Sequence, residues 1–360
     1  MHNRDEDISK FLDSIGWGDA TRIPVPGDAS TRRYERLTRG TDKAVLMDAP
    51  KASEAPSEPA GASIEDRKAL GYNATARLAG ADMESFAAIS TALTQRGFSA
   101  PKIYGADLTQ GFLLLEDFGD PVYARVITQD PSLEKPLYEA AMDTLAAIYR
   151  SSFPEVLPFQ NTEWRVRDYD LTSMLAEMDL CLNWFVRDFD RKISDTARAK
   201  FSELWEQAFK LLDVHAKGLC LRDFHAENLF WLEGREATSR VGLIDFQDGL
   251  FVHPSYDPAS LIEDIRRDVS ADLTEPLLER FCDKAGLKYD ADFKAAYAVT
   301  GGQRNTKLLG FPVRADLKYG KPQYRALLPR VKRHFQNSLR HDALTDIRIW
   351  FETHLPEALK

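Results

Sequence analysis

The fold is decided by residues 220–248, which read CLRDFHAENLFWLEGREATSRVGLIDFQD. In this stretch Asp223 is followed five residues later by Asn228, and an apolar run begins directly after the asparagine. A polar turn at 233–235 then leads into a second apolar run, which ends at Asp245. Two short apolar runs around a turn predict a hairpin, and the loop geometry should bring the three polar side chains to one point.

Phosphoryl transfer explains each member of this ordered set. One carboxylate must orient the attacking hydroxyl and accept its proton, and we expect Asp223 to be this catalytic residue. A neutral amide and a second carboxylate must hold Mg²⁺ against the phosphates of a nucleotide, which makes Asn228 and Asp245 the expected metal ligands. Aspartate and asparagine are also common in loops for purely local reasons, so one member alone would carry little weight. The ordered set favours a phosphotransferase.

Composition excludes several other classes of protein. The 360 residues contain 47 Lys and Arg against 56 Asp and Glu, a net charge of −9, which argues against a surface built to coat nucleic acid or an anionic membrane. The longest uninterrupted apolar runs have five residues, as at 145–149, far below the roughly 20 that a membrane span requires. The acidic N-terminus lacks a secretory apolar segment, so we expect a cytoplasmic protein.

The three cysteines lack the paired spacing of a zinc or dithiol site. Cys181, Cys220 and Cys282 are therefore expected to be small core residues in a reducing compartment.

No nucleic acid, membrane or obligate protein partner is expected.

The pattern of apolar and polar residues changes along the chain. A first amphipathic helix is expected behind the capping candidate Asp5 and ends before Gly16. Small strands are expected near 22–25, 33–37, 44–47, 102–106 and 111–116, with a helix over 82–96. The segment from 50 to 63 is rich in Pro, Ala, Ser and Glu, which predicts a mobile surface loop.

The break at 117–121 is the expected boundary between two lobes. Beyond it the pattern is mostly helical, with helices expected over 134–150, 163–187, 194–217 and four or five more after 257, and with a strand-containing island at 218–258. We therefore expect an α+β protein with a small antiparallel β lobe over 1–118 and a large helical lobe over 119–360.

These residues resemble the aminoglycoside phosphotransferase and choline kinase-like family, which is related to the protein kinases. The resemblance implies the two-lobe protein-kinase-like fold, ATP as co-substrate, and the same roles for Asp223, Asn228 and Asp245. It departs from the family at Leu221, which stands where the signature has a histidine that props the loop. In the family an aspartate in the position of Asp257 caps a helix that supports the loop, so a structural role is expected there.

The same resemblance places nucleotide contacts in the small lobe. Its phosphate-covering hairpin corresponds to 26–33, and the lobe hinge corresponds to the end of the last small-lobe strand. The implied nucleotide-binding residues are Gly27, Ser30, Thr31, Arg32, Arg33, Glu116 and Asp117. The strand lysine of the family is missing, because Leu46-Met47 occupies its position. Either Arg32 or Arg33, or Lys43 of the same strand, takes over the phosphate contact, or the affinity for nucleotide is low; we favour the arginines.

A basic cluster bears on the substrate. Between 301 and 335 nine Lys and Arg residues face one acidic residue, which disfavours a polycationic aminoglycoside and favours an anionic or neutral acceptor. The alternative is a solvated basic face of a helix without a binding role.

Five segments, at 27–34, 46–50, 111–117, 244–248 and 303–310, resemble those of bacterial cell-wall-recycling sugar kinases, which act on the anomeric hydroxyl of N-acetylmuramate and N-acetylglucosamine. The similarity covers nearly the whole chain, except the loop at 50–66. In such an enzyme Arg304 and Lys307 are candidates for binding the lactyl carboxylate, and His225 either contacts the sugar or supports the loop.

Two alternatives remain open from the sequence. The first is a kinase of the same family that phosphorylates another hydroxyl compound, such as an amino alcohol, a hydroxy acid or another sugar. The second is a nucleotide-binding module without catalysis, whose missing lysine and histidine would mark decay. The retention of all three proton-handling and metal-binding groups favours an enzyme.

Overall fold

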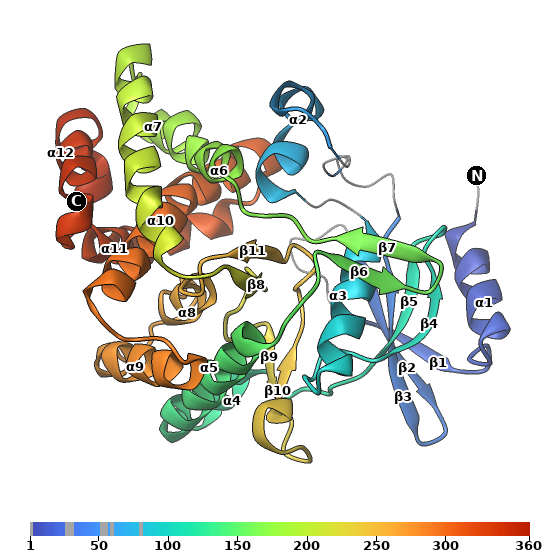
Figure 1. The fold of residues 1–360 in the computed structure, drawn as a ribbon. Coiled ribbons are helices and arrows are strands. Elements are labelled where there is room, and N and C mark those ends of the chain that lie inside the picture. Colours follow the sequence, from blue (N-terminus) through green and yellow to red (C-terminus); the bar gives the residue numbers. More distant parts are fainter. Residues whose placement is uncertain (1–2, 26–31, 51–56, 58–60, 79–81) are drawn as a thin grey trace.

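A five-stranded antiparallel sheet forms the small lobe of the computed structural model, which describes residues 3–25, 32–50, 57, 61–78 and 82–360 (Figure 1). Its strand order is β1-β2-β3-β5-β4. The strands are β1 (Thr21–Val25), β2 (Arg33–Arg39), β3 (Asp42–Asp48), β4 (Ile103–Asp107) and β5 (Phe112–Glu116). All five expected strands are confirmed, with ends that shift by a few residues.

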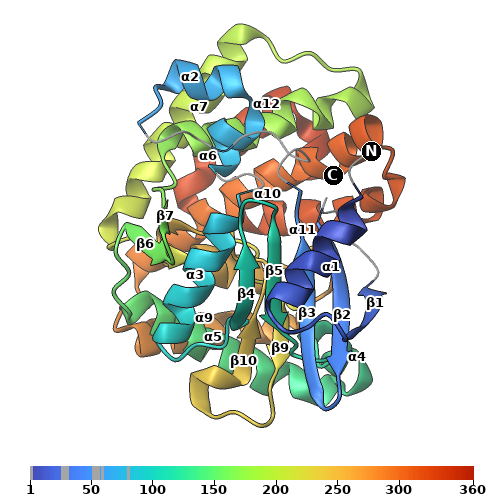
Figure 2. The same cartoon turned by 90° about the vertical axis from the view of Figure 1, so that its right-hand side faces the viewer.

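The sheet is covered on both faces, as Figure 2 shows. Successive side chains of a strand point to opposite faces, and apolar side chains occur on both. On β5, Phe112 and Leu114 pack with Phe11 of α1 (Arg4–Ser14), whereas Leu113 and Leu115 pack with the core that contains α3 (Met83–Gln95). The expected cap of the first helix is wrong: α1 begins at Arg4 with Asn3 as its N-cap, and Asp5 lies in the first turn.

A second hairpin, β6 (Val156–Phe159) and β7 (Thr162–Arg165), lies beside α3 in both views (Figures 1 and 2). The expectation of a helix from 163 is wrong here. Alternate residues Leu157 and Phe159 are buried with Trp164 in the main core, so this segment follows a strand period. Helix α6 starts only at Leu171. The side chain of its N-cap residue, Asp170, accepts a hydrogen bond from the Ser173 N–H.

The large lobe is mainly helical. Its α-helices are α4 (Tyr123–Gln129), α5 (Glu134–Arg150), α6 (Leu171–Asn183), α7 (Asp195–Phe209), α8 (Tyr256–Ile262), α9 (Thr274–Ala285), α10 (Ala291–Tyr319), α11 (Leu328–Ser338) and α12 (Thr345–His354). Short helical turns are η3 (Pro131–Leu133), η4 (Phe185–Phe189), η5 (Lys210–Val214), η6 (Ala237–Arg240), η7 (Ala271–Leu273), η8 (Pro322–Leu327), η9 (Asp342–Leu344) and η10 (Pro356–Leu359). The long α10 lies at the centre of this lobe and contacts α6, α8 and α11.

Four short strands form the expected island in the helical lobe. They are β8 (Gly218–Cys220), β9 (Leu229–Trp231), β10 (Val241–Leu243) and β11 (Leu250–Val252). They pair antiparallel as β9 with β10 and β8 with β11. The two pairs fix the ends of the loops that carry Asp223 and Asp245.

Two further elements between β3 and α3 are absent from the sequence-based expectation. They are α2 (Ile64–Leu70) and the π-helical turn η2 (Asn73–Arg77). Helix α2 has a full capping box, since Ser63 and Asp66 bond reciprocally. Most of the loop expected to be mobile, at 51–56 and 58–60, lies outside the described residues.

Two simpler expectations can be compared with this architecture. The three cysteines are buried and unpaired, as expected. Within the described part of the chain, no helix combines the length and apolarity that crossing a membrane requires.

Candidate active site

The structure brings Asp223, Asn228 and Asp245 together. Because Leu229 pairs with Leu243 at the start of the β9–β10 ladder, the residues just before β9 and just after β10 are neighbours. Asn228 Nδ2 lies 3.2 Å from Asp245 Oδ2 and donates a hydrogen bond of 2.9 Å to the backbone carbonyl of Asp223. The convergence expected from their spacing is therefore present in the fold.

Asp245 is held in an unusual environment. Its backbone has a φ of 61°, in the left-handed region that few non-glycine residues adopt. Gln247 Nε2 donates a hydrogen bond of 2.8 Å to its Oδ1. Burial, and then the negative charge of Asp223, raise the pKa of Asp245, whereas the positive charge of Arg32 lowers it. A further cation beside Asp245 would relieve this repulsion.

The donor chemistry of this site fits Mg²⁺. In the described part of the chain, no three His, Cys, Asp or Glu side chains gather as a metal site of their own. The carboxylate of Asp245 and the amide of Asn228 suit an ion that takes few protein oxygens and completes its shell with water and phosphate. Asn228 presents its Nδ2 to Asp245, so its amide must turn over to offer Oδ1 to a metal.

The loop before Asp223 is fixed by a buried carboxylate. Asp257 accepts hydrogen bonds from the N–H groups of Leu221 (2.7 Å) and Arg222 (2.9 Å), and from the Cys220 thiol (3.0 Å). Asp257 therefore supports the loop directly, and its expected capping role is wrong, because Ser255 occupies the N-cap of α8.

A second support was not visible in the sequence. The backbone of Arg222 has a φ of 68°, and its guanidinium is paired with the fully buried Glu177 of α6. Lys307 donates to the same carboxylate at 2.8 Å. Burial raises the pKa of Glu177, but Lys307 and Arg222 outweigh it and hold that pKa at about 2. Leu221, at the position of the signature histidine, is buried in the core, and the Arg222–Glu177 pair anchors the loop at the next residue.

His225, Arg304 and Lys307 have different surroundings. His225 is buried, and its Nε2 lies 3.2 Å from the Asn228 amide nitrogen. Burial lowers the pKa of His225, and the neighbouring cations Arg266 and Arg304 lower it further. Arg304 donates from Nη2 to Ser260 Oγ at 2.8 Å. Lys307, by contrast, forms an ion pair with Glu177.

Part of the basic cluster is paired with carboxylates, two of which come from elsewhere in the chain. Arg325 pairs with Asp316 and Asp188. Arg330 and Arg333 both pair with Asp268. These pairs involve three of the nine basic residues, so they neutralise only part of the local positive charge that the sequence displays.

The small-lobe residues are only partly described. Gly27, Ser30 and Thr31 lie outside the described residues. Arg32 is 7% exposed and lies close enough to Asp245 to lower its pKa, whereas Arg33 is exposed at the start of β2. Of the two arginines, Arg32 is the one beside the candidate metal site.

The strand that lacks a lysine, β3, offers no substitute of its own. Leu46 and Met47 are fully buried on opposite faces of the sheet. Lys43 is exposed near the β2–β3 turn, opposite Thr38. Asp48, at the other end of β3, pairs with Arg4 of α1.

The expected hinge residues are already engaged in part. The backbone N–H of Glu116 donates a hydrogen bond of 2.8 Å to the Lys102 carbonyl. The backbone of Glu116 therefore has only its carbonyl group left to bond the adenine of a nucleotide. Asp117 pairs with Arg36 at 2.8 Å and accepts a hydrogen bond from the Gly119 N–H at 2.8 Å. The Asp117 side chain therefore shapes the hinge and ties it to β2.

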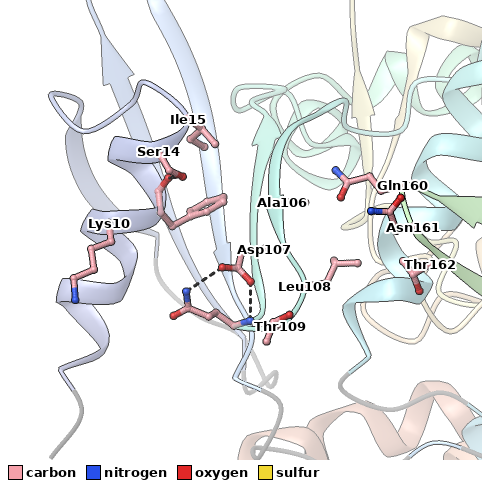
Figure 3. Close-up of a pocket in the computed structure, with 12 residues that line it drawn as sticks. Lys10, Ser14, Ile15, Ala106, Asp107, Leu108, Thr109, Gln160, Asn161 and Thr162 are labelled. Atoms are coloured by element: carbon pink, nitrogen blue, oxygen red, sulfur yellow. Dashed lines mark hydrogen bonds between the residues drawn. The ribbon is translucent and has the colours of Figure 1, made fainter.

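A hollow of the described surface lies away from this site. Figure 3 shows it between α1, the β4–β5 turn and the β6–β7 hairpin, with Lys10, Asp107 and Thr162 among its lining residues. Its volume is about 560 Å³, but it is open, and Asp107 is bonded to Gln110 within its own turn. None of the groups expected to transfer phosphate lines it, so this hollow is not the candidate active site.

The fold and the three converging groups define a two-lobed phosphotransferase. The chain belongs to the phosphotransferase enzyme family, whose APH model matches residues 21–297. Members of this class transfer phosphate to a hydroxyl acceptor with ATP as co-substrate.

Similar proteins cover nearly the whole chain. An N-acetylmuramate/N-acetylglucosamine kinase from Caulobacter vibrioides is 37% identical over 346 residues, which are 96% of this chain and 95% of that protein. A kinase of the same name from Pseudomonas aeruginosa is 27% identical, over 93% of this chain and 89% of its own length.

Solved structures share the fold at low sequence identity. A putative aminoglycoside phosphotransferase from Ralstonia eutropha has a TM-score of 0.61 at 13% identity, over 93% of this chain and 98% of that one. A choline/ethanolamine kinase family protein from Mesorhizobium loti has a TM-score of 0.56 at 15% identity, over 96% and 99%. Such neighbours establish the two-lobe fold.

Proposed function

We propose that this protein is an ATP- and Mg²⁺-dependent kinase that phosphorylates the anomeric hydroxyl of N-acetylmuramate and N-acetylglucosamine. The products are sugar 1-phosphates, and the role is recycling of peptidoglycan in the cytoplasm. The observation that carries the proposal is the meeting of Asp223, Asn228 and Asp245 at one point of a chain that is 37% identical, over its length, to a kinase named for these sugars.

In this proposal Asp223 orients the anomeric hydroxyl and accepts its proton. That hydroxyl is more acidic than an ordinary alcohol, so a simple carboxylate suffices as base, and positioning supplies most of the rate. Asn228 and Asp245 hold Mg²⁺, which neutralises charge on the transferred phosphoryl group when bound. Arg32, beside Asp245, adds a positive charge from the small lobe.

The nucleotide in this proposal lies between the lobes. The segment with Gly27, Ser30 and Thr31 covers the phosphates together with Arg32 and Arg33, and the backbone near Glu116 and Asp117 faces the adenine. The division into a nucleotide-binding lobe at 1–118 and a sugar-binding lobe at 119–360 is part of the same proposal. It is supported by the end of β5 at Glu116 and the start of α4 at Tyr123.

For the lactyl carboxylate of N-acetylmuramate we favour Arg304 over Lys307. Lys307 already neutralises Glu177, whereas the hydrogen bond that Arg304 donates goes to the neutral hydroxyl of Ser260. A guanidinium can also bind a carboxylate through two parallel hydrogen bonds. His225 supports Asn228 in this arrangement, as their 3.2 Å contact suggests.

The test is ADP release measured with each amino sugar, with Mg²⁺ and again with EDTA. We expect turnover with both sugars, none with EDTA, and an acid-labile 1-phosphate in the phosphorus NMR spectrum of the product. Activity only toward amino alcohols, hydroxy acids or other sugars would favour a different kinase of the family. Nucleotide binding without ADP release from any acceptor would favour the non-catalytic module.

The base assignment has its own test. Asp223→Asn should lower kcat by about 1,000-fold or more while nucleotide binding persists, because the amide cannot accept the proton. The control is Asp213→Asn, at an exposed position of η5. Near-normal turnover of Asp223→Asn would refute the assignment.

A further inference from the structure

The segment that contains α2 and η2, residues 63–78, joins the two lobes. In sequence it lies between β3 and α3 of the small lobe, but in space it packs against α6 of the large lobe, and α2 lies far from the sheet (Figures 1 and 2). Its buried Arg67 donates to Asp170 at 2.6 Å and to Ser173 at 2.7 Å, at the start of α6. The segment is therefore docked on the helical lobe by specific polar contacts.

At the other end of this segment, Arg77 contacts both loops of the candidate active site. Its guanidinium forms two hydrogen bonds, of 2.8 and 3.0 Å, with the carboxylate of Asp248. Asp248 lies three residues after Asp245. The backbone carbonyl of Arg77 accepts a 3.1 Å hydrogen bond from Arg222 Nη1, and Arg222 directly precedes Asp223.

Charge gives this contact a second consequence. The Asp248 side chain is only 9% exposed, and it lies close enough to Asp245 for the two negative charges to repel each other. Arg77 neutralises Asp248. Removal of Arg77 would deprive a nearly buried carboxylate beside Asp245 of these two hydrogen bonds and of the cation that makes them, which is a costly change.

We propose that Arg77 is a positioning residue for phosphoryl transfer. By holding Asp248 and Arg222 together, it sets the relative placement of the metal-binding loop and the catalytic loop, and so couples docking of residues 63–78 to Mg²⁺ affinity. Outer residues that orient metal ligands typically change metal affinity or activity by about 10-fold to 100-fold when removed. The catalytic part of this inference rests on the proposed kinase function.

The test compares Arg77→Gln with Arg280→Gln. Arg280 is a matched control, because it also forms two hydrogen bonds with one carboxylate, both of 2.7 Å, to Asp143. That pair joins α9 to α5. We expect Arg77→Gln to raise the Mg²⁺ concentration for half-maximal ADP release by about 10-fold and to lower kcat similarly, with a smaller change in the KM for sugar. Arg280→Gln should leave these parameters unchanged.

Two further variants keep the test decisive if Arg77→Gln folds poorly. Arg77→Lys keeps the charge but loses the two-pronged geometry, so it should fold and show an intermediate Mg²⁺ requirement. Adding Asp248→Asn to Arg77→Gln removes the uncompensated carboxylate and should recover part of the Mg²⁺ affinity. Wild-type kcat and Mg²⁺ dependence in Arg77→Gln or Arg77→Lys, or a loss that only follows the folded fraction, would overturn the proposal.

A readout without sugar separates this inference from the proposed function. Binding of ADP, titrated at several Mg²⁺ concentrations, requires no acceptor. If the wild-type protein binds ADP with Mg²⁺ but phosphorylates neither amino sugar, the sugar assignment fails. The role of Arg77 would then still be decided by whether Arg77→Gln weakens the Mg²⁺-dependent part of ADP binding and Arg280→Gln does not.

Discussion

Buried carboxyl groups behind the catalytic loop differ in charge state because their partners differ. Burial raises the pKa of Glu263 to about 7, although a 2.6 Å hydrogen bond from Asn305 opposes the shift. Burial likewise raises the pKa of Asp257 to about 6. Glu177 is equally buried but has two cations beside it, and its pKa falls to about 2. The same desolvation thus gives opposite results, depending on whether a cation is within contact.

Glu263 should make stability depend on pH. Its pKa in the folded protein, about 7, lies above its ordinary value of 4.5, so the folded state binds the proton more tightly. The resulting stabilisation is complete below about pH 4.5 and is lost as pH rises through 7. Glu263→Gln imitates the protonated group and should remove a fall on the order of 3 kcal/mol between pH 4.5 and 8. Unfolding by urea at several pH values measures it.

The control for this prediction is Glu236→Gln, at an exposed position before η6. It should keep the pH dependence of the wild type. An unchanged pH profile in Glu263→Gln would show that Glu263 is not protonated in the folded protein near neutral pH.

At the scale of elements, α10 can lie at the centre of the large lobe because glycine lets it approach α6. A Cβ placed on Gly310 would lie 2.0 Å from the backbone carbonyl oxygen of Leu180. This is far closer than real contacts allow, and the obstacle is backbone, which cannot rotate away. The close approach also sets the distance between Glu177 of α6 and Lys307 of α10.

Gly310→Ala should therefore disturb both the packing and the site. We expect a loss of about 3 kcal/mol or more in the free energy of unfolding, because overpacking against backbone has no inexpensive relief. Gly234→Ala is the matched control, since nothing lies within 4 Å of its added Cβ. Thermal and urea unfolding measure the free energy of unfolding of both variants. Equal values for the two variants would contradict the close approach of α10 to α6.

At the scale of the whole molecule, the candidate site depends on groups from both lobes. Arg32 comes from the small lobe, Asp223 and Asp245 come from the large lobe, and Arg77 reaches the large lobe from the segment between them. A ligand that binds only when all these parts are in place stabilises the folded state by mass action.

Removal of the metal should expose this linkage. At ATP and Mg²⁺ near 100 times their dissociation constants, we expect a gain of about 2.7 kcal/mol in the free energy of unfolding, and EDTA should remove most of it. Asp245→Asn should lose the Mg²⁺-dependent part, whereas Asp272→Asn, at an exposed position of η7, should retain it. Because the pKa of Asp245 is raised, protons should compete with Mg²⁺ for its carboxylate. The Mg²⁺ concentration needed for this stabilisation should therefore increase as pH falls. A gain with ATP that is equal in EDTA would contradict the metal assignment.

The sequence by itself was enough for the order of the lobes, the strands of the sheet and the meeting of Asp223, Asn228 and Asp245. These features depend on local periodicity and on a short spacing across one hairpin, so neighbouring residues carry the information. Local reasoning failed at 163–165, where burial of Trp164 against the core decided for a strand.

Only the tertiary structure decided which distant groups support or neutralise that local pattern. The pairs Arg222–Glu177 and Arg77–Asp248 join residues 45 and 171 positions apart, and no single-sequence pattern reports such contacts. The same holds for part of the basic cluster, because Asp188 pairs with Arg325, and Asp268 pairs with Arg330 and Arg333. Charge compensation acts through space, so its outcome depends on packing that sequence spacing does not encode.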